Sequence, residues 1–213
     1  MKKTNILFDL DGTLTDPMIG ITKSVQYALA HYGIEVSDLQ SLVPFIGPPL
    51  KGSFEKYYGF CDAQAEDAVR VYREYFSQTG LFENAVYPGI PELLKKLTEQ
   101  GFQLYVATSK PTVFATQILD HFGLSCYFNF IGGSLLSGER VEKDDVIRYV
   151  LRENNIKKET ATMVGDRIFD IEGAKKCGIS AIGVRYGYGE PDEFVKADAV
   201  ADTVEEIGRI LGI

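Results

Sequence analysis

The chain has 213 residues, of which 45% are hydrophobic and 24% are charged. These proportions are ordinary for a soluble globular protein, and the length suits one domain or a core domain that carries an insertion. The formal net charge of −8 argues against a nucleic-acid-binding protein, which usually presents a basic face. An anionic ligand would therefore need a local cluster of cationic groups.

The start of the chain and its cysteines favour a cytoplasmic protein. The apolar run after Met1-Lys2-Lys3 is broken by Asp9, so we expect no signal peptide and no membrane-spanning segment. Cys61, Cys126 and Cys177 are far apart and form no C-x-x-C pair, so we expect buried, reduced thiols. Neither a membrane nor a nucleic-acid polymer is expected as a partner.

The first predicted elements are a strand and a helix. Residues 4–9 are predicted to form a strand buried in a parallel sheet, because Ile6-Leu7-Phe8 is continuous rather than alternating. Asp16 is the predicted N-cap of a helix with Pro17 at its first position. This helix is expected to end before Gly33, a residue type that suits the position after a helix.

The next segment is predicted to be entirely helical. It shows no convincing strand up to residue 83, and helices are expected over 50–58 and 63–78. Tyr72 and Phe76 share one face of the second of these helices, and we interpret them as packing residues rather than as a substrate box. Residues 17–83 are therefore predicted to be an all-helical insertion.

From Pro88 onward, predicted helices and strands alternate. The helices are expected over 91–100, 111–122, 141–154, 168–177 and 203–211, and the strands over 102–107, 127–131, 160–164, 179–184 and 198–200. Such alternation is typical of an α/β fold with a parallel sheet covered on both faces. We predict a doubly wound, Rossmann-like core domain made of residues 1–16 and 84–213, with residues 17–83 as an inserted helical domain.

Acidic residues follow the first predicted strand at a spacing that points to chemistry. Asp9 and Asp11 are two residues apart, so at the end of an extended strand they face the same side. Their charges repel unless a cation or a shared proton relieves them. Ligands of open α/β sheets bind beyond the carboxyl ends of the strands, where Thr108-Ser109-Lys110, Asp166 and Asp170 are also expected.

These residue types favour a hard cation held by oxygen atoms, most simply Mg²⁺. A zinc site is not expected, because the two histidines, His31 and His121, lie inside predicted helices and away from the strand ends.

Four dispersed segments resemble, in order, the four motifs of haloacid-dehalogenase-superfamily phosphatases. Asp9-x-Asp11, within Asp-Leu-Asp-Gly-Thr-Leu-Thr-Asp, resembles the first motif, and Thr108 after Tyr105-Val106-Ala107 resembles the second. Lys143 resembles the lysine of the third motif. Gly165-Asp166 with Asp170 resembles the acidic fourth motif.

The resemblance implies a role for each of these residues. Asp9 would be the nucleophile that forms an aspartyl-phosphate, and Asp11 the general acid and base. The implied phosphate-binding residues are Thr108, Ser109 and Lys143. The implied Mg²⁺ ligands are Asp9, the backbone carbonyl of Asp11, Asp166 and Asp170. Lys143 is preferred to Lys110 as the phosphate lysine, because the family pattern places this residue at the start of the helix before the fourth strand. We interpret Lys110 as a surface residue at a helix start.

The resemblance also bears on the substrate. A helical insertion after the first motif resembles the cap of the phosphoglycolate phosphatase and 5′-nucleotidase branch, which implies a small-molecule phosphomonoester. Lys51 is a candidate ligand for a substrate anion, with a solvated surface lysine as the alternative. The choice of substrate stays open, and we expect a monomer or a weak homodimer.

Three other readings remain open. A β-phosphoglucomutase-like mutase usually carries Glu-Asp where this chain has Gly165-Asp166. A receiver domain also gathers acids and a lysine, but it would be much shorter and would lack the helical insertion. A catalytically silent binding protein on the same fold would be expected to lack one of the four motifs.

Overall fold

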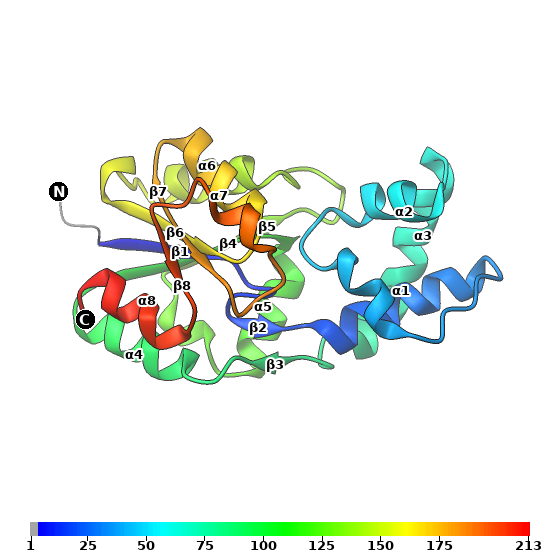
Figure 1. Cartoon of the computed structure of the whole chain (residues 1–213), viewed down its shortest axis with the longest axis horizontal. Helices are drawn as coiled ribbons and strands as arrows, with labels where there is room; N and C mark the ends of the chain where they lie inside the picture. Colours follow the sequence, from blue (N-terminus) through cyan, green and yellow to red (C-terminus); the bar gives the residue numbers. More distant parts are fainter. Residues whose placement is uncertain (1–3) are drawn as a thin grey trace. The chain divides into compact units, whose positions relative to one another are not determined.

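The computed structural model describes residues 4–213, and the chain divides into two compact units (Figure 1). The core unit consists of Met1–Asp16 and Val86–Ile213. The helical unit consists of Pro17–Ala85. Among the described residues, no helix has the length and apolar character needed to cross a membrane.

The core unit is built on a six-stranded parallel sheet. Its strands, in spatial order, are β5 (Phe130–Ser134), β4 (Gln103–Pro111), β1 (Asn5–Phe8), β6 (Ala161–Gly165), β7 (Ser180–Val184) and β8 (Ala199–Ala201). β1 lies in the middle, where Ile6 is in register with Leu104 on one side and Thr162 on the other. Ile6, Leu7 and Phe8 are completely buried, as expected for a central strand of a parallel sheet.

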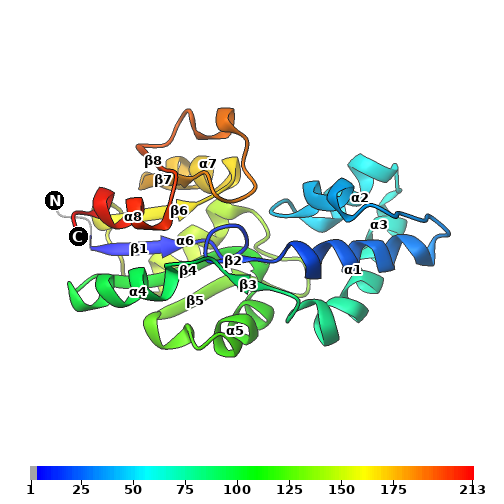
Figure 2. The same ribbon diagram turned by 60° about the horizontal axis from the view of Figure 1, so that its bottom comes forward.

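Helices cover both faces of this sheet (Figures 1 and 2). One face carries α6 (Lys143–Glu153) and α7 (Ile168–Cys177), and the other carries α4 (Ile90–Glu99), α5 (Thr112–His121) and α8 (Val204–Leu211). The core under α6 and α7 includes Leu7, Val146 and Ile171, all fully buried. The predicted α/β fold with a doubly wound parallel sheet is therefore confirmed.

Two predicted strands differ from the structure by more than one residue at an end. β4 continues to Pro111, although its apolar run ends at Ala107, because its last residues are polar and carry no hydrophobic signal. β5 begins at Phe130 rather than Tyr127. The preceding Ser125–Tyr127 form a short 3₁₀ turn, in which the Tyr127 N–H donates to the Leu124 carbonyl.

The helix start predicted at Asp16 is also different. α1 (Met18–His31) begins one residue later than expected, and no side chain caps it. Asp16 belongs instead to the short strand β2 (Thr15–Asp16), which forms a two-stranded sheet with β3 (Ala85–Val86). Its carboxylate accepts a hydrogen bond from the Tyr188 hydroxyl, so it is not available as a cap.

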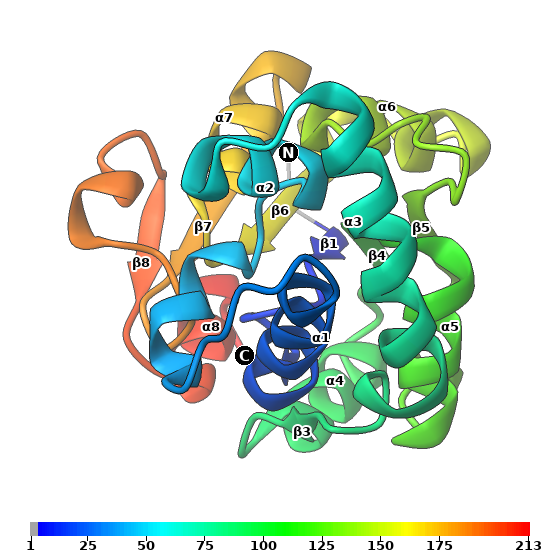
Figure 3. The ribbon, with the colours of Figure 1, turned by 90° about the vertical axis from the view of Figure 1, so that its right-hand side faces the viewer.

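The helical unit contains three α-helices and a short 3₁₀ helix among its residues. After α1 come the 3₁₀ helix η1 (Leu39–Phe45), α2 (Leu50–Tyr58), α3 (Asp62–Tyr75) and a π-helical turn, η2 (Phe76–Gly80). α3 contacts both α1 and α2 (Figure 3). Tyr72 and Phe76 are buried with stacked rings 5.2 Å apart, so they pack within this unit as predicted.

The predicted burial of the cysteines is wrong for two of the three residues. Cys61 and Cys126 are exposed, and Cys177 is half-buried. Cys61 precedes the first turn of α3 and Cys126 lies in the 3₁₀ turn before β5, so both occupy connections at the surface. All three are free thiols.

Two glycines allow a close backbone approach inside the helical unit. A Cβ atom on Gly20 of α1 would lie 1.9 Å from the carbonyl oxygen of Gly80, and one on Gly80 would lie 2.8 Å from the carbonyl oxygen of Gly20. The Gly20 N–H donates to the Glu83 carbonyl at 2.9 Å, which fixes the end of this unit against α1. Side chains cannot be accommodated at this crossing without moving the backbone.

We predict that Gly20→Ala destabilises the protein by about 1–3 kcal/mol, because the added methyl group must separate two backbones. Gly52→Ala is the matched control, since Gly52 lies in α2 with nothing within 4 Å of its Cβ position. The control is expected to gain about 0.5–1 kcal/mol from helix propensity. Urea unfolding measures both; equal effects of the two substitutions would contradict the close approach.

Candidate active site

Three acidic side chains meet at the carboxyl edge of the sheet. Asp9 follows β1, Asp166 follows β6, and Asp170 lies in the first turn of α7. One carboxylate oxygen from each lies within 4.8 Å of the others, and all three residues are buried. The Asp9 N–H donates to the Val164 carbonyl at 2.9 Å, so the sheet itself fixes the first of these residues beside the strand that carries the second.

Glycine makes room for these carboxylates. A Cβ atom on Gly12 would lie 2.1 Å from Oδ2 of Asp166, and the φ angle of Gly12 is +80°, which disfavours other residues. A Cβ atom on Gly165 would lie 2.2 Å from Cγ of Asp170. Asp170 is held in place by its Oδ2 atom, which accepts a hydrogen bond from the Arg167 N–H at 3.0 Å.

Lys143 joins two of the three acids. Its Nζ atom lies 2.8 Å from Oδ1 of Asp9 and 2.8 Å from Oδ1 of Asp170, and it donates to the Ala107 carbonyl at 3.2 Å. Burial by itself would lower the pKa of Lys143, but the carboxylates of Asp170 and Asp9 outweigh it and raise the pKa above its ordinary value. The lysine therefore stays charged and holds Asp9 in a fixed orientation.

Lys110 makes the corresponding pair with the second aspartate of the first motif. Its Nζ atom lies 2.8 Å from Oδ2 of Asp11, and only 6% of its side chain is exposed. The interpretation of Lys110 as a surface residue is therefore wrong. β4 extends four residues further than its apolar run, so Lys110 projects from the end of a strand rather than from the start of a helix.

The other predicted residues of the core unit lie at the same edge. Thr108 is buried within β4, and its Oγ1 atom accepts a hydrogen bond from the Lys110 N–H at 3.3 Å. The carbonyl of Ser109 accepts a hydrogen bond from Ser134 at 2.7 Å. Oδ1 of Asp11 is buried and has no hydrogen-bond partner within residues 4–213, so it is available to a ligand.

Lys51 belongs to the helical unit, where two acids surround it. Its Nζ atom lies 2.6 Å from Asp62 and 2.9 Å from Glu66, both of the neighbouring helix α3. These two hydrogen bonds raise the pKa of Lys51. A substrate anion would have to compete with both carboxylates, and the role of Lys51 toward a substrate stays a prediction.

The balance of buried charge favours binding of a cation at this edge of the sheet. Four buried acids lie against two lysines among residues 4–213, so four full negative charges would exceed these positive charges by two; the acids are Asp9, Asp11, Asp166 and Asp170. Burial raises the pKa of Asp11. It also raises the pKa of Asp166 strongly, aided by repulsion from Asp170 and Asp9. The pKa of Asp170 rises to about 6, mainly because of its burial.

A divalent cation fits this arrangement. It would balance the excess of two negative charges. The converging donors are all oxygen atoms, which are the ligands that Mg²⁺ prefers. Residues that could hold it are Asp9, Asp166 and Asp170, with the adjacent backbone carbonyl of Asp11 as a further oxygen donor.

One part of the site was not assigned from the sequence. Tyr188, in the loop after β7, donates its backbone N–H to Oδ2 of Asp166 at 2.8 Å. Tyr186 donates its hydroxyl to the Thr13 carbonyl at 2.8 Å, beside the first motif. The available signal was the position of Arg185-Tyr186-Gly187-Tyr188-Gly189 after a strand of the sheet.

Comparison with known proteins agrees with this geometry. The model of the haloacid dehalogenase-like hydrolase family matches residues 6–184. A 5′-nucleotidase from Pseudomonas aeruginosa is 52% identical over 91% of this chain and 87% of its own length. The tyrosine-protein kinase PtkA of Mycobacterium tuberculosis is 37% identical over 98% of this chain and 72% of its own length.

A solved structure is similar over the full length of both chains. It is that of a predicted phosphatase from Clostridium acetobutylicum, with 50% identity, a TM-score of 0.97, and coverage of 100% of each chain. The chain therefore belongs to the haloacid dehalogenase-like hydrolases, and within them it is a phosphoric monoester hydrolase.

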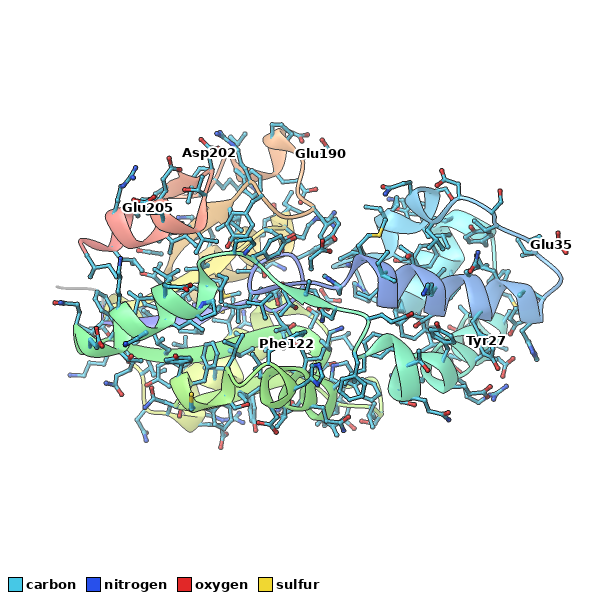
Figure 4. The ribbon with its side chains drawn as sticks, turned by 90° about the horizontal axis from the view of Figure 1, so that it is seen from below. Tyr27, Glu35, Phe122, Glu190, Asp202 and Glu205 are labelled. Atoms are coloured by element: carbon cyan, nitrogen blue, oxygen red, sulfur yellow. The ribbon has the colours of Figure 1, made fainter. Side chains whose placement is uncertain are left out.

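We predict that Asp166→Asn removes stabilisation by Mg²⁺. At Mg²⁺ concentrations 100-fold above the dissociation constant, the ion should stabilise the wild-type protein by about 2.7 kcal/mol and the variant by much less. Thermal unfolding in EDTA and in Mg²⁺ measures both. Glu205→Gln is the control, since Glu205 lies on α8 and is 75% exposed, paired with Arg209 (Figure 4). Equal Mg²⁺ stabilisation of wild type and Asp166→Asn would contradict the metal assignment.

The same experiment has an expected pH dependence. Carboxyls with a raised pKa bind more protons in the folded state than in the unfolded state, so the stability they contribute is lost as the pH rises. Without Mg²⁺, the stability of the wild type should therefore fall as the pH rises toward about 6, the pKa of Asp170. Asp166→Asn should show a smaller fall, because it lacks the contribution of the raised pKa of Asp166.

Proposed function

We propose that the protein is a Mg²⁺-dependent phosphatase of small-molecule phosphomonoesters that works through an aspartyl-phosphate, with nucleoside 5′-monophosphates as the favoured substrates. The observation that carries the reaction is the arrangement of Asp9 and Asp11. Each of these neighbouring carboxylates has its own buried lysine, and the first also faces Asp166 and Asp170. The 5′-nucleotidase relative supports the choice of substrate.

Asp9 is the proposed nucleophile. Its carboxylate is ion-paired with Lys143, which holds it in a fixed orientation for attack. One Asp9 oxygen forms a bond to phosphorus while the bond from phosphorus to the ester oxygen breaks. When bound, Mg²⁺ would be held by Asp9, the Asp11 carbonyl and Asp166, with Asp170 in support, and it would neutralise charge on the phosphoryl group.

Asp11 is the proposed general acid and base. Burial raises its pKa, which favours the protonated form needed at the start of the reaction. Its proton goes to the departing alkoxide, and the alcohol leaves. Asp11 then accepts a proton from the water that attacks phosphorus, which cleaves the aspartyl-phosphate, releases inorganic phosphate and restores Asp9. Acid–base assistance of this kind typically contributes about 10²–10⁴-fold to a rate.

The phosphoryl oxygens need donors besides the cation. We propose that the Thr108 hydroxyl, backbone N–H groups around Ser109 and the ammonium of Lys143 provide them. Without these groups, a phosphomonoester of about two negative charges would face several carboxylates, each pair costing about 4 kcal/mol at 4 Å and an effective dielectric constant of 20.

We further propose that the helical unit acts as a cap that selects the leaving group and excludes bulk water, as its place in the chain after the first motif suggests. The three free cysteines suit a reducing compartment, so we propose a cytoplasmic location. A monomer or weak homodimer is proposed as the working form.

The alternative of a mutase is disfavoured by one contact. Mutases of the β-phosphoglucomutase type usually carry Glu at the position of Gly165. In this chain a Cβ atom there would lie 2.2 Å from Cγ of Asp170, so a glutamate would displace that carboxylate. The alternative of a silent binding protein is disfavoured because the residues of all four motifs are present in the sequence.

We predict that Asp9→Asn abolishes hydrolysis of p-nitrophenyl phosphate, with kcat lowered by at least about 10³-fold. The amide keeps the size of the side chain but removes its nucleophilic charge. The wild-type activity should require Mg²⁺ and disappear with EDTA. Asp202→Asn, an exposed substitution after β8 (Figure 4), is the control and should retain activity. Full activity of Asp9→Asn would remove the nucleophile assignment.

We predict that a nucleoside 5′-monophosphate gives the highest kcat/KM in a panel that also contains phosphoglycolate and sugar phosphates. Steady-state phosphate release by the purified enzyme at saturating Mg²⁺ measures the ranking. A preference for phosphoglycolate would keep the proposed reaction and replace the proposed substrate. Transfer of the phosphoryl group to a protein tyrosine, with no release of phosphate, would contradict hydrolysis itself.

A further inference from the structure

The loop after β7 contacts the site through its backbone as well as its side chains. The Tyr188 N–H donates to Oδ2 of Asp166, while Oδ1 of the same carboxylate accepts from the Thr13 hydroxyl at 3.2 Å. Asp166 therefore has a donor on each oxygen, from two different segments of the chain. The orientation of the Asp166 carboxylate therefore depends on the position of the loop after β7.

The loop is pressed against Asp166 by glycine. A Cβ atom on Gly187 would lie 2.4 Å from Cβ of Asp166 and 2.3 Å from the Gly12 carbonyl oxygen. A Cβ atom on Gly189 would lie 2.0 Å from the carbonyl oxygen of Asp166. The two glycines flank Tyr188, so its N–H is delivered to the carboxylate by a backbone that no larger residue could replace.

The side chain of Tyr188 is tied to a different place. Its hydroxyl donates to Oδ1 of Asp16, 172 positions earlier in the chain. Asp16 is the last residue of β2 and of the first segment of the core unit, so the next residue, Pro17, begins the helical unit. Burial and the bond to Asp16 raise the pKa of the Tyr188 hydroxyl, which keeps it a donor.

Two more tyrosines hold this arrangement. Tyr186 donates its hydroxyl to the Thr13 carbonyl, and its ring meets that of Tyr87 edge to face, with centroids 4.9 Å apart. The side chain of Tyr87, just after β3, is also hydrogen-bonded to Tyr188. The loop is therefore anchored where the chain leaves the core unit and where it re-enters.

We propose that Tyr188 is a positioning residue that connects the Asp166 carboxylate to the linker, the junction of Asp16 and Pro17 where the chain passes from the core unit to the helical unit. One residue makes both contacts, by its N–H and by its hydroxyl, so a displacement of the linker is transmitted to Asp166. The inference rests on the proposed Mg²⁺ site, because Asp166 is one of its ligands. Neither contact involves a reacting group, so the effect is on metal affinity and not on the chemical step.

Tyr188→Phe tests this, since it removes the bonds of the hydroxyl to Asp16 and Tyr87 and leaves the N–H to Asp166. Titration calorimetry with Mg²⁺ and no substrate should give an affinity weaker than wild type by roughly tenfold, as for other residues that support metal ligands. At saturating Mg²⁺, kcat should return to within about twofold of wild type. Tyr27→Phe, on α1 of the helical unit (Figure 4), is the control and should bind Mg²⁺ as the wild type does.

The linker partner is tested separately. Asp16→Asn keeps an acceptor for the hydroxyl and should retain most of the affinity, whereas Asp16→Ala should match Tyr188→Phe. The losses of Mg²⁺ affinity in the two single variants should not add in the double variant Asp16→Ala/Tyr188→Phe, because each substitution removes the bond between Tyr188 and Asp16.

Three outcomes separate the inference from the function on which it rests. Wild-type Mg²⁺ affinity in Tyr188→Phe would overturn the inference, even if the variant unfolds at a lower temperature. Fully additive losses in the double variant would also overturn it. Absence of Mg²⁺ binding by the wild-type protein would instead refute the proposed metal site, and with it the reason for positioning Asp166.

Discussion

The repulsion among buried carboxylates is the constraint on which the rest of the site depends. Asp9, Asp166 and Asp170 bring oxygens within 4.8 Å of one another in a place where water cannot screen them. The fold tolerates this because Lys143 lies between Asp9 and Asp170, and because backbone N–H groups from two segments donate to Asp166 and Asp170. Removing any of these partners would leave a buried charge without compensation.

The two lysines divide the acids between them in a way that suits two tasks. Lys143 is surrounded by three acceptors, and its ammonium holds the Asp9 carboxylate in place, as the proposed role of Asp9 as a nucleophile requires. Lys110 lies on one oxygen of Asp11 and leaves the other without a protein partner in the described chain. Burial acts against Lys110 and raises the pKa of Asp11. The two neighbouring aspartates therefore have different surroundings, although their residue type is the same.

The sequence predicts the acids better than it predicts the groups around them. Asp9, Asp11 and Asp166 follow apolar runs that read as buried strands, so their place at the carboxyl edge follows from the fold class. Lys143 follows no strand directly, and only the resemblance to a family identified it. Lys110 was misplaced because β4 ends in polar residues, which hydrophobic periodicity cannot distinguish from a loop.

Contacts between segments that are distant in the chain cannot be predicted from local sequence patterns either. The bond from Tyr188 to Asp16 joins residues 172 positions apart, and nothing in the composition of either segment specifies the other. The sequence predicts Asp16 to be a helix cap, because aspartate before Pro17 is a good cap in isolation. In the structure its carboxylate instead accepts a hydrogen bond from the Tyr188 hydroxyl. Long-range pairing outweighed the local preference.

A segment of eight residues, 9–16, connects the first acid of the site to the linker. Asp9 starts the stretch at the end of β1, Gly12 turns the backbone against Asp166, and Asp16 ends it at the boundary of the core unit. The Gly12 N–H donates to the Thr15 carbonyl at 2.7 Å, so the turn and the linker share one hydrogen-bonded segment. A segment this short cannot shift at one end without straining the other. Asp9, the turn against Asp166 and the connection to the helical unit therefore belong to one short segment, and the loop of Tyr186 and Tyr188 is hydrogen-bonded to it at Thr13 and Asp16.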